Sequence, residues 1–408
     1  MSQAVPIDKG TGARRHALIL DRRAVMGTEI CRSLARLGCT VDVVAQAGSP
    51  AFYSRSCANR FPAPPLESGA PFLRVVREVV SAQRYDAIFL CNEEVLDAIM
   101  TLPEYEQWPG LVLSTRSSLL TALSKFAMMQ VARDAGVAIP KSFLPHDETE
   151  LPTIAKDLGF PLIIKGDRGE SGNHVRLVDR PGKLFSAYRE VAALEAGSGY
   201  RPLVQKYVRG TAYSVGGLFY QGQPLRVCAH RKLVGVPPLG GLTVRGVTER
   251  CPGLLEQAFE IFAALKYSGL GHVEFVRDEK GSLRFLEINP RVWGTVGIGE
   301  YAGVDFFTPY FQLAHGQIPE PDLDFCEGVR FHRIGREGKM IRRRPSRIFG
   351  FVRDCIEPSV RSDFWWSDPA PHIASLMTGW SSPVPKMAST EATKHNARQR
   401  SSINGLLR

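Results

Sequence analysis

The sequence lacks the features that mark membrane, secreted and zinc-binding proteins. No apolar run approaches the length of a membrane-spanning helix, and Met1–Gly10 contains no apolar segment of the kind found in signal peptides. The 8 cysteines are scattered and form no Cys-x-x-Cys pair, so the sequence predicts neither a zinc site nor a disulfide framework. Reduced thiols and a cytoplasmic location are therefore expected.

Signatures of several nucleotide and nucleic-acid binders are also missing. Asp21–Gly27 lacks the G-x-G-x-x-G spacing of a dinucleotide-binding turn, and no Gly-Lys-Ser/Thr opens a helix as in a P-loop. The net charge of +10 lies largely in residues 330–353, which include Arg342-Arg343-Arg344, and in 386–408. No recognition helix, zinc finger or aromatic-rich RNA-binding motif accompanies these segments. We therefore expect no nucleic-acid partner, and interpret the basic segments as solvated faces or as attraction for anionic substrates.

What the chain does have, with 408 residues and 44% hydrophobic content, is enough material for two or three packed domains. Its first part alternates short apolar segments with helical ones, which is typical of a parallel sheet with helices on both faces. We interpret this part as a Rossmann-like scaffold that shapes a substrate pocket. Cys91 and Asn92, which follow a predicted strand, are candidates to face that pocket. The predicted strands are 16–20, 40–45 and 87–90, and the predicted helices are 29–37 and 73–83.

Residues 271–294 are the most informative segment of the chain. Val273–Val276 and Leu283–Ile288 alternate apolar and polar residues, as half-buried strands do. Asp278–Gly281, which lies between them, has the composition of a turn. The segment therefore predicts an antiparallel hairpin.

The polar side chains of this hairpin form a set of hard oxygen ligands. Glu274 and Glu287 lie on its two strands, and Asn289 and Arg291 follow the second strand. Carboxylate and amide oxygens suit Mg²⁺, which is normally shared with substrate phosphates. A guanidinium beside them suits the charge of a phosphoryl or acyl-phosphate group. The hairpin therefore indicates an enzyme that consumes a nucleotide.

Two upstream segments are candidates for the same site. Lys165 ends the apolar strand 161–165, and the loop Gly166–His174 that follows carries three glycines. Backbone N–H groups in such a loop, with an ammonium nearby, can cradle phosphate, although a solvated surface lysine is the alternative. Gln205–Val208 could hold an adenine ring between its backbone groups and the Val208 side chain, with an ordinary strand as the alternative.

Taken in this order, the segments resemble the ATP-grasp superfamily, whose ligases activate a carboxylate as an acyl phosphate. The resemblance covers about residues 15–320, and Glu287–Gly294 (Glu-Ile-Asn-Pro-Arg-Val-Trp-Gly) is its most specific part. It implies an α/β protein with a Rossmann-like N-terminal domain, a two-lobed α+β ATP-grasp domain and a C-terminal extension. The segments that carry it are Ser124–Val137, Pro161–Val178, Gln205–Val215 and Glu274–Gly294.

The resemblance also implies roles for the residues at matching positions. Arg291 would steady the transferring phosphoryl group, and Lys165, a second catalytic candidate, would contact the nucleotide phosphates together with Lys125. The ligands of two Mg²⁺ ions, with Mn²⁺ as the alternative metal, would be Glu274, Glu287 and Asn289. The ATP-binding residues would be Lys125, Lys165, Gly169, Ser171, Gly172, Asn173, Gln205, Lys206 and Val208.

The chain departs from the pattern of the family at three positions. Ala212 stands where an acidic residue often binds the ribose, and Gln205 stands where the hinge usually carries glutamate. Ser124 precedes Lys125 where an aspartate often does. These departures concern nucleotide affinity and base preference more than catalysis, because none of these residues carries the chemistry.

Another loop, with an arginine after it, lies where related ligases place a substrate-facing segment. Arg245 follows Pro237–Thr243, and its guanidinium could hold a substrate carboxylate, with a plain connecting loop as the equal alternative. His230 and His272 are interpreted as structural residues, because neither lies beside a plausible nucleophile.

The C-terminal part is rich in arginine and tryptophan. Phe364-Trp365-Trp366 and Trp380 indicate a small satellite core, with a partner surface or a peripheral membrane contact as alternatives. The predicted organisation is a disordered segment 1–14, a Rossmann-like domain 15–120, an ATP-grasp domain 121–320 (small lobe about 140–208, large lobe about 209–320), a basic and aromatic extension 321–385 and a disordered tail 386–408.

The resemblance predicts an ADP-forming ligase that joins a small-molecule carboxylate to an amine, or less readily a thiol, through an acyl phosphate. A carboxylase-like enzyme that phosphorylates bicarbonate is the alternative within enzymes. A nucleotide-binding assembly module recruited through the C-terminal region is the alternative from another class. A homodimer is one expected state of assembly, and the identity of the substrates stays open.

Overall fold

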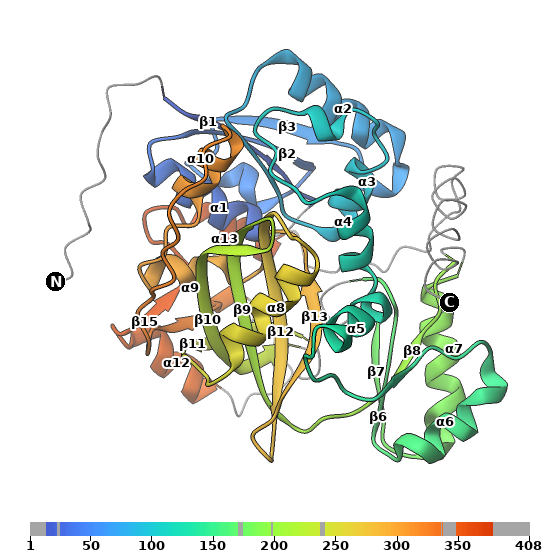
Figure 1. Ribbon diagram of the computed structural model, residues 1–408. Helices are drawn as coiled ribbons and strands as arrows, with labels where there is room; N and C mark the ends of the chain where they lie inside the picture. Colours follow the sequence, from blue (N-terminus) through green and yellow to red (C-terminus); the bar gives the residue numbers. More distant parts are fainter. Residues whose placement is uncertain are drawn as a thin grey trace.

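The computed structural model of the protein describes residues 14–22, 25–169, 174–196, 199–236, 241–335, 337 and 348–377 (Figure 1). Apart from residue 14, the terminal segments predicted to be disordered lie outside these residues, and so does the Arg342-Arg343-Arg344 run. None of the helices in this part of the chain combines the length and the apolar content needed to cross a lipid bilayer.

The first sheet is parallel, as the alternation of strands and helices predicts. Its four strands follow the order β3-β2-β1-β4. β1, β2 and β4 are buried because they are largely apolar, whereas β3 is mostly exposed, and α2 buries Phe72, Val76 and Val79 from one face at helical spacing. The elements are β1 (His16–Leu20), α1 (Val25–Arg36), β2 (Thr40–Gln46), β3 (Asn59–Ala63), α2 (Ala70–Ala82), β4 (Ala87–Leu90) and α3 (Glu93–Ile99).

A second, antiparallel sheet has its own small core. Its order is β5-β8-β6-β7, and α6 covers it with Leu151, Ile154 and Leu158. Figure 1 shows this unit in green, apart from the blue first sheet. Its elements are β5 (Ser142–Phe143), α6 (Leu151–Leu158), β6 (Leu162–Lys165), β7 (Val175–Val178), α7 (Leu184–Leu194) and β8 (Leu203–Lys206). The helices α4 (Arg116–Leu123) and α5 (Lys125–Asp134) precede this unit and belong to the larger core.

The largest sheet has seven strands in the order β13-β12-β9-β10-β11-β14-β15. All neighbouring pairs are antiparallel except β14 and β15, which run parallel. Its strands are β9 (Gly210–Tyr220), β10 (Gln223–Val236), β11 (Leu242–Thr248), β12 (Gly269–Asp278), β13 (Leu283–Asn289), β14 (Arg330–His332) and β15 (Val360–Ser362). The helices are α8 (Leu254–Ala264), α9 (Val296–Tyr301), α10 (Phe307–Ala314), α12 (Ile348–Ile356) and α13 (Ala370–Met377). The α/β class with a Rossmann-like first part and two further sheets is therefore confirmed.

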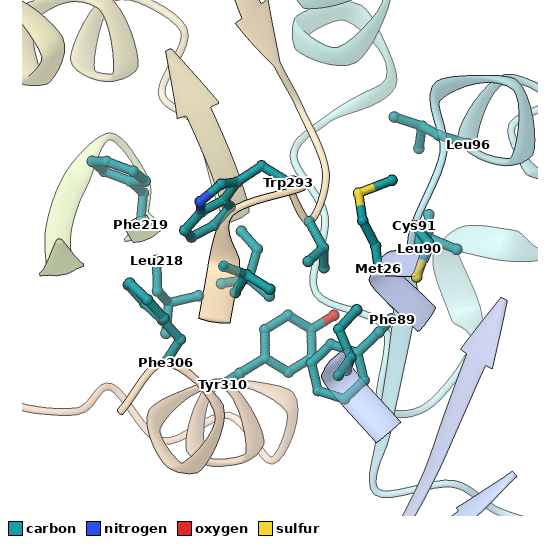
Figure 2. Close-up of a cluster of buried hydrophobic side chains, with 14 of the residues drawn as sticks. Met26, Phe89, Leu90, Cys91, Leu96, Leu218, Phe219, Trp293, Phe306 and Tyr310 are labelled. Carbon is teal, nitrogen blue, oxygen red and sulfur yellow. The ribbon is translucent and has the colours of Figure 1, made fainter. Parts of the chain in front are cut away.

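One hydrophobic core joins the first sheet to the large sheet. Figure 2 shows Phe89 of β4 against Tyr310 of α10, and the ring centroids lie 4.6 Å apart. The Tyr310 hydroxyl donates to the Ile88 carbonyl at 2.7 Å and accepts from the Val112 N–H at 3.1 Å. Met26 and Trp293 lie in the same cluster. This shared core fixes the carboxyl end of β4 against the loop that follows β13.

The C-terminal segment packs on the first unit of the chain. The Arg32 and Arg36 guanidinium groups lie 5.0 and 4.5 Å from the Trp365 ring centre. Arg32 also donates from Nε to Asp368 Oδ2 at 2.9 Å, and both side chains are buried. The Trp365 ring therefore contributes to the packing between α1 and the C-terminal segment, while the Phe364 ring contacts the Trp366 and His372 rings. Trp366 is 89% exposed, and Trp380 lies outside the described residues.

A buried ion pair at the same junction makes stability depend on pH. Glu29 of α1 accepts from Arg333 at 2.9 Å, and burial raises the pKa of Glu29 to about 7, although Arg333 opposes this shift. The folded state then binds more protons than the unfolded chain between about pH 4.5 and 7. We expect the free energy of unfolding to fall as the pH rises through this window, by up to about 3 kcal/mol.

Chemical denaturation at pH 5 and pH 8 measures this effect. The Glu29→Gln variant should lose most of the pH dependence, since its amide does not ionise, while the exposed Glu78→Gln of α2 serves as the matched control. An unchanged pH dependence in Glu29→Gln would show that another group titrates in this range.

Candidate active site

The hairpin predicted from residues 271–294 forms, and it pairs the two acidic residues directly. Glu274 of β12 lies opposite Glu287 of β13, and His272 lies opposite Asn289. Glu287 and Asn289 are two positions apart on one strand, so their side chains leave the same face. The structure therefore brings the three predicted metal ligands to one face of the large sheet.

The electrostatics of this face favour a bound cation. Burial raises the pKa of the Glu287 carboxyl, and the Glu274 carboxylate beside it raises it further, while Lys125, Lys165 and Lys232 lower it. Two neighbouring carboxylates repel each other, and a divalent cation between them relieves that repulsion. In the described ranges no three His, Cys, Asp or Glu side chains gather as a metal site, so phosphate or water oxygens would complete the coordination. This donor set fits Mg²⁺.

The two lysines that were predicted to contact phosphate lie at the end of an inner strand of the small sheet and at the start of α5. Lys165 ends β6, is 6% exposed, and donates from Nζ to the Leu286 carbonyl at 3.2 Å. Burial lowers the pKa of Lys165 to about 8, and the Glu287 carboxylate opposes this shift. Lys125, at the start of α5, donates from Nζ to the Gly169 carbonyl at 2.7 Å. The structure thus places the Lys165 ammonium next to β13. We call β12 and β13, which carry the predicted metal ligands, the metal hairpin.

Asp167 holds the two lysine segments together, although the sequence did not suggest a role for it. Its carboxylate accepts from the Ser124 hydroxyl at 2.9 Å and from the Phe126 N–H at 2.8 Å, and its carbonyl accepts from the Lys125 N–H at 3.1 Å. Ser124 also caps α5 through the Ala127 N–H. The available signal was an acidic residue two positions after the strand-end lysine.

Arg291 is anchored in the loop that follows β13. Its Nη2 donates to Asn289 Oδ1 at 2.9 Å, and its Nη1 donates to the Val292 carbonyl at 2.8 Å. The Val292 N–H donates to the Leu90 carbonyl of β4 at 3.3 Å. These bonds hold the arginine at the junction of the large sheet with the first unit. Glu93 of α3 also lies there, with its Oε1 3.7 Å from Arg291 Nη2.

Lys232 of β10 is a further cation that the sequence reading missed. Its Nζ lies 3.2 Å from Glu274 Oε2 and donates to the Gly241 carbonyl at 2.8 Å. Only its position two residues after His230, on a strand beside β9, could have indicated this contact.

The predicted adenine-binding segment lies on β8 and just beyond it. The buried Gln205 amide donates to the Ser142 hydroxyl at 2.8 Å, and Lys206 Nζ donates to the Gly159 carbonyl at 3.3 Å. Both polar side chains therefore form hydrogen bonds within the unit of the small sheet. Val208 follows the strand and is half-buried. In the predicted glycine-rich loop, Gly169 is described, whereas Ser171, Gly172 and Asn173 lie outside the described residues.

Arg245 is not brought to this group of residues. Its Nε and Nη2 donate to the two oxygens of Glu337 at 2.7 Å each, and its Nη1 lies 2.8 Å from Asp354 Oδ2. Glu337 and Asp354 are both buried. The guanidinium is thus enclosed by two carboxylates of the C-terminal segment.

The register of the large sheet explains why Arg245 lies away from the predicted metal ligands. Glu274, Ser214 and His230 are partners across β12, β9 and β10 and therefore share one face. Gly246 of β11 faces the His230 ring, so the adjacent Arg245 side chain leaves the opposite face. The predicted substrate role of Arg245 does not fit this arrangement, and Pro237–Gly240 lie outside the described residues.

The two histidines on the metal face are buried among aromatic neighbours. Burial lowers the pKa of His230 to about 3, so its ring is neutral. The His272 ring lies nearly parallel to the Trp293 indole, with 5.8 Å between their centres. Trp293 in turn occupies the space above Gly216, where an added Cβ would lie 2.2 Å from the indole. Gly216 therefore permits the close approach of the loop that carries Arg291.

A family model described as an ATP-grasp domain matches residues 122–295. The chain contains an ATP-grasp domain. The match begins before α5 and ends after Gly294, so it includes both the small sheet and the metal hairpin.

One curated relative and two solved structures illustrate the likeness. The D-alanine–D-alanine ligase of Dechloromonas aromatica (strain RCB) is 31% identical over 185 residues, which are 41% of this chain and 57% of the ligase. A biotin carboxylase complex with β,γ-ATP from Campylobacter jejuni has a TM-score of 0.65 and 18% identity, and covers 77% of this chain and 74% of that one. An L-amino acid ligase from Bacillus licheniformis has a TM-score of 0.58 and 19% identity, with 76% of each chain covered. The chain spans less than two thirds of the curated relative, and the structural likeness shows a shared fold.

Replacing the strand-end lysine of the ATP-grasp domain tests the phosphate-binding assignment. Lys165→Met removes a buried ammonium without adding bulk, and we expect ATP affinity to fall by about 10–100-fold, as for the loss of a charge-assisted hydrogen bond. Titration calorimetry with ATP and Mg²⁺ measures the change. Lys141→Met, an exposed lysine paired with Asp157, is the control, and equal affinities in the two variants would place the phosphates elsewhere.

Proposed function

We propose that the protein is an ADP-forming ligase that joins a carboxylate to an amine through an acyl phosphate. One observation carries this proposal. Lys165, at the end of a small-sheet strand, lies next to the large-sheet hairpin on which Glu274 and Glu287 are paired, and Arg291 follows that hairpin. Cations on one side and paired carboxylates on the other suit a metal-bound triphosphate. ATP and Mg²⁺ are therefore the proposed nucleotide and metal.

Positioning and charge would supply the catalysis. Lys125 and Lys165 would bind phosphate oxygens, and Glu274, Glu287 and Asn289 would hold the metal. Bound Mg²⁺ would supply neutralisation of the charge on the β- and γ-phosphates. The metal-ligand carboxylates and Lys165 are buried or nearly so, which strengthens these interactions by excluding water.

In the first step a carboxylate oxygen attacks the γ-phosphorus and the bond to ADP breaks, so ADP leaves with the bridging oxygen. Arg291 would steady the charge of the transferring group. In the second step the amine nitrogen attacks the acyl carbon, the carbon–oxygen bond breaks, and inorganic phosphate leaves with that electron pair. The amine loses its protons to solvent or to a nearby base, and no side-chain nucleophile is required.

A bicarbonate-phosphorylating enzyme is the second candidate, and the likeness to the biotin carboxylase complex favours it. The two functions share the nucleotide site and differ in the carboxyl acceptor. Bicarbonate-dependent ADP release without amine dependence would favour the second candidate. A cytoplasmic location and a homodimer remain parts of the proposal.

Trapping the acyl phosphate tests the proposal without knowledge of the amine. The protein is incubated with ATP, Mg²⁺, hydroxylamine and single carboxylic acids, including each protein amino acid, and both ADP and hydroxamate are measured. Hydroxamate formation with at least one acid supports a ligase. ATP binding without ADP release for every acid and for bicarbonate would instead indicate a nucleotide-binding module.

A further inference from the structure

The helix α12 presents apolar side chains to solvent. The exposed fractions are 84% for Phe349, 74% for Ile356, 49% for Val352 and 45% for Ile348. These residues follow one another at helical spacing, so they form a single stripe, which we call the outer face of α12. Among the exposed positions of Ile348–Ile356, only Arg353 is charged. A helix that serves only to cover a protein core has the reverse pattern, with polar side chains outside.

The inner face of the same helix is fixed to the large sheet by ion pairs. The buried Asp354 has its Oδ2 2.8 Å from Arg245 Nη1 and its Oδ1 3.2 Å from Arg330 Nη2. The Phe351 ring meets the His332 ring edge to face, with 5.3 Å between the two centres. Figure 1 shows α12 in orange-red at the outer edge of the molecule. These contacts hold the helix in one orientation, so its apolar stripe faces outward.

The charge of the surrounding sequence favours an anionic partner. Residues 330–353 contain nine arginines and lysines and one acidic residue, Glu337. That carboxylate is already paired, because both of its oxygens accept from Arg245. Arg353 lies one turn after Phe349 and its side chain is 67% exposed, although its Nε also pairs with Asp354 at 3.2 Å. An apolar stripe with arginine beside it is typical of a helix that lies on a membrane containing anionic lipids.

A second copy of the chain fits this face less well than a lipid surface. A two-fold contact would place α12 against α12 and bring two strongly basic segments together, which repel each other. Side chains as exposed as Phe349 and Ile356 protrude from the protein, and a fluid lipid surface accepts them without a preformed groove. Anionic headgroups at that surface attract arginine at the same time.

We propose that the outer face of α12 docks on the surface of an anionic phospholipid bilayer. Phe349, Val352 and Ile356 enter the boundary between headgroups and acyl chains, and Arg353 lies at the level of the phosphates. The helix lies in the plane of the surface and does not cross the bilayer. This contact does not depend on the proposed ligation, so the inference goes beyond the proposed function and its failure would leave that function untouched.

Co-sedimentation of the full chain with vesicles tests the inference. One set of vesicles contains equal amounts of phosphatidylglycerol and phosphatidylcholine, and the other contains phosphatidylcholine alone. The variants are Phe349→Gln and Ile356→Gln, alone and together, which change exposed positions and leave the buried contacts of α12 in place. Ile318→Gln is the matched control, since Ile318 is 64% exposed but lies outside α12. Thermal unfolding of each variant verifies that it folds as the wild type does.

We expect the wild type to bind the anionic vesicles and to leave the phosphatidylcholine vesicles unbound. Binding should weaken as NaCl rises from about 0.1 M to about 1 M, because salt screens the attraction between arginine and the headgroups. Each single variant should lower the partition coefficient by about 10-fold, and the double variant should lower it further, since each change removes one apolar side chain from the lipid boundary. Ile318→Gln should bind as the wild type does.

Three outcomes would overturn the inference. The first is a wild type that does not bind anionic vesicles, and the second is a double variant that binds them as well as the wild type, which would place the lipid contact elsewhere. The third is a dimer, seen by light scattering without vesicle binding, that dissociates in the double variant. That result would assign the outer face of α12 to a second copy of the chain.

Discussion

Glu287→Gln should lower kcat by at least ~10³-fold while the protein folds normally, because it removes metal-binding charge without changing side-chain volume. The buried carboxyl of Glu287 has a raised pKa, and its neighbour Glu274 is one cause. Replacing it with a neutral amide relieves that repulsion. The variant should therefore be as stable as the wild type, or more stable, although it is inactive. Loss of activity together with retained or increased stability is typical of a residue placed for function.

Steady-state ADP release and thermal unfolding, measured side by side, test this expectation. Glu279→Gln is the matched control, since Glu279 is an exposed carboxylate in the turn of the same hairpin. Magnesium titration adds a second readout, because the variant should need far more Mg²⁺ for any remaining turnover. Wild-type activity in Glu287→Gln would remove the metal assignment, and lost activity with a lower Tm would indicate damage to the fold instead.

Much of the fold could be predicted because its elements depend on local patterns. The strands at His16–Leu20 and Ala87–Leu90 appear with the predicted bounds, since each is a short apolar segment between turn residues. The hairpin at residues 271–294 follows from alternation and turn composition in the same way. The strand Asn59–Ala63 was not predicted, because its exposed and polar residues carry no apolar period. It forms through pairing with β2, which is a tertiary contact.

The candidate site was predictable only as far as a motif extends along the chain. Glu274, Glu287, Asn289 and Arg291 lie in one hairpin and its loop, so their spacing placed them together. Glu93 joins them through the packing of the first unit against the large sheet, which no local pattern records. The hairpin residues are close together in the sequence, whereas Glu93 is far from them, and contacts between distant residues depend on the whole fold.

Arg245 illustrates the opposite error, a residue that was predicted to contact substrate but lies away from the candidate site. Its position near a glycine-rich loop indicated a substrate contact, but the face of a strand on which a side chain lies is decided by register. A shift of one residue places a side chain on the other face, and Arg245 meets Glu337 there. The buried carboxylate comes from a segment about 90 residues away, which the sequence could not pair with it.

Arg291→Lys should lower kcat by about 10²–10³-fold while ATP affinity stays close to the wild-type value. Lysine keeps the positive charge, but it cannot donate to the Asn289 amide, the Val292 carbonyl and a phosphoryl oxygen in the planar geometry of a guanidinium. Since Arg291 would act on the transferring group rather than on the bound nucleotide, the defect should appear in the chemical step.

Single-turnover formation of ADP, compared with the Kd for ATP from calorimetry, separates these two effects. Arg284→Lys on β13, the strand that precedes Arg291, is the control, because its guanidinium pairs with Asp278 near the turn of the hairpin. A weaker Kd with an unchanged single-turnover rate would place Arg291 on the nucleotide phosphates. A normal value for both would leave the transferring group to Lys125, Lys165 and Lys232, the lysines that lower the pKa of Glu287.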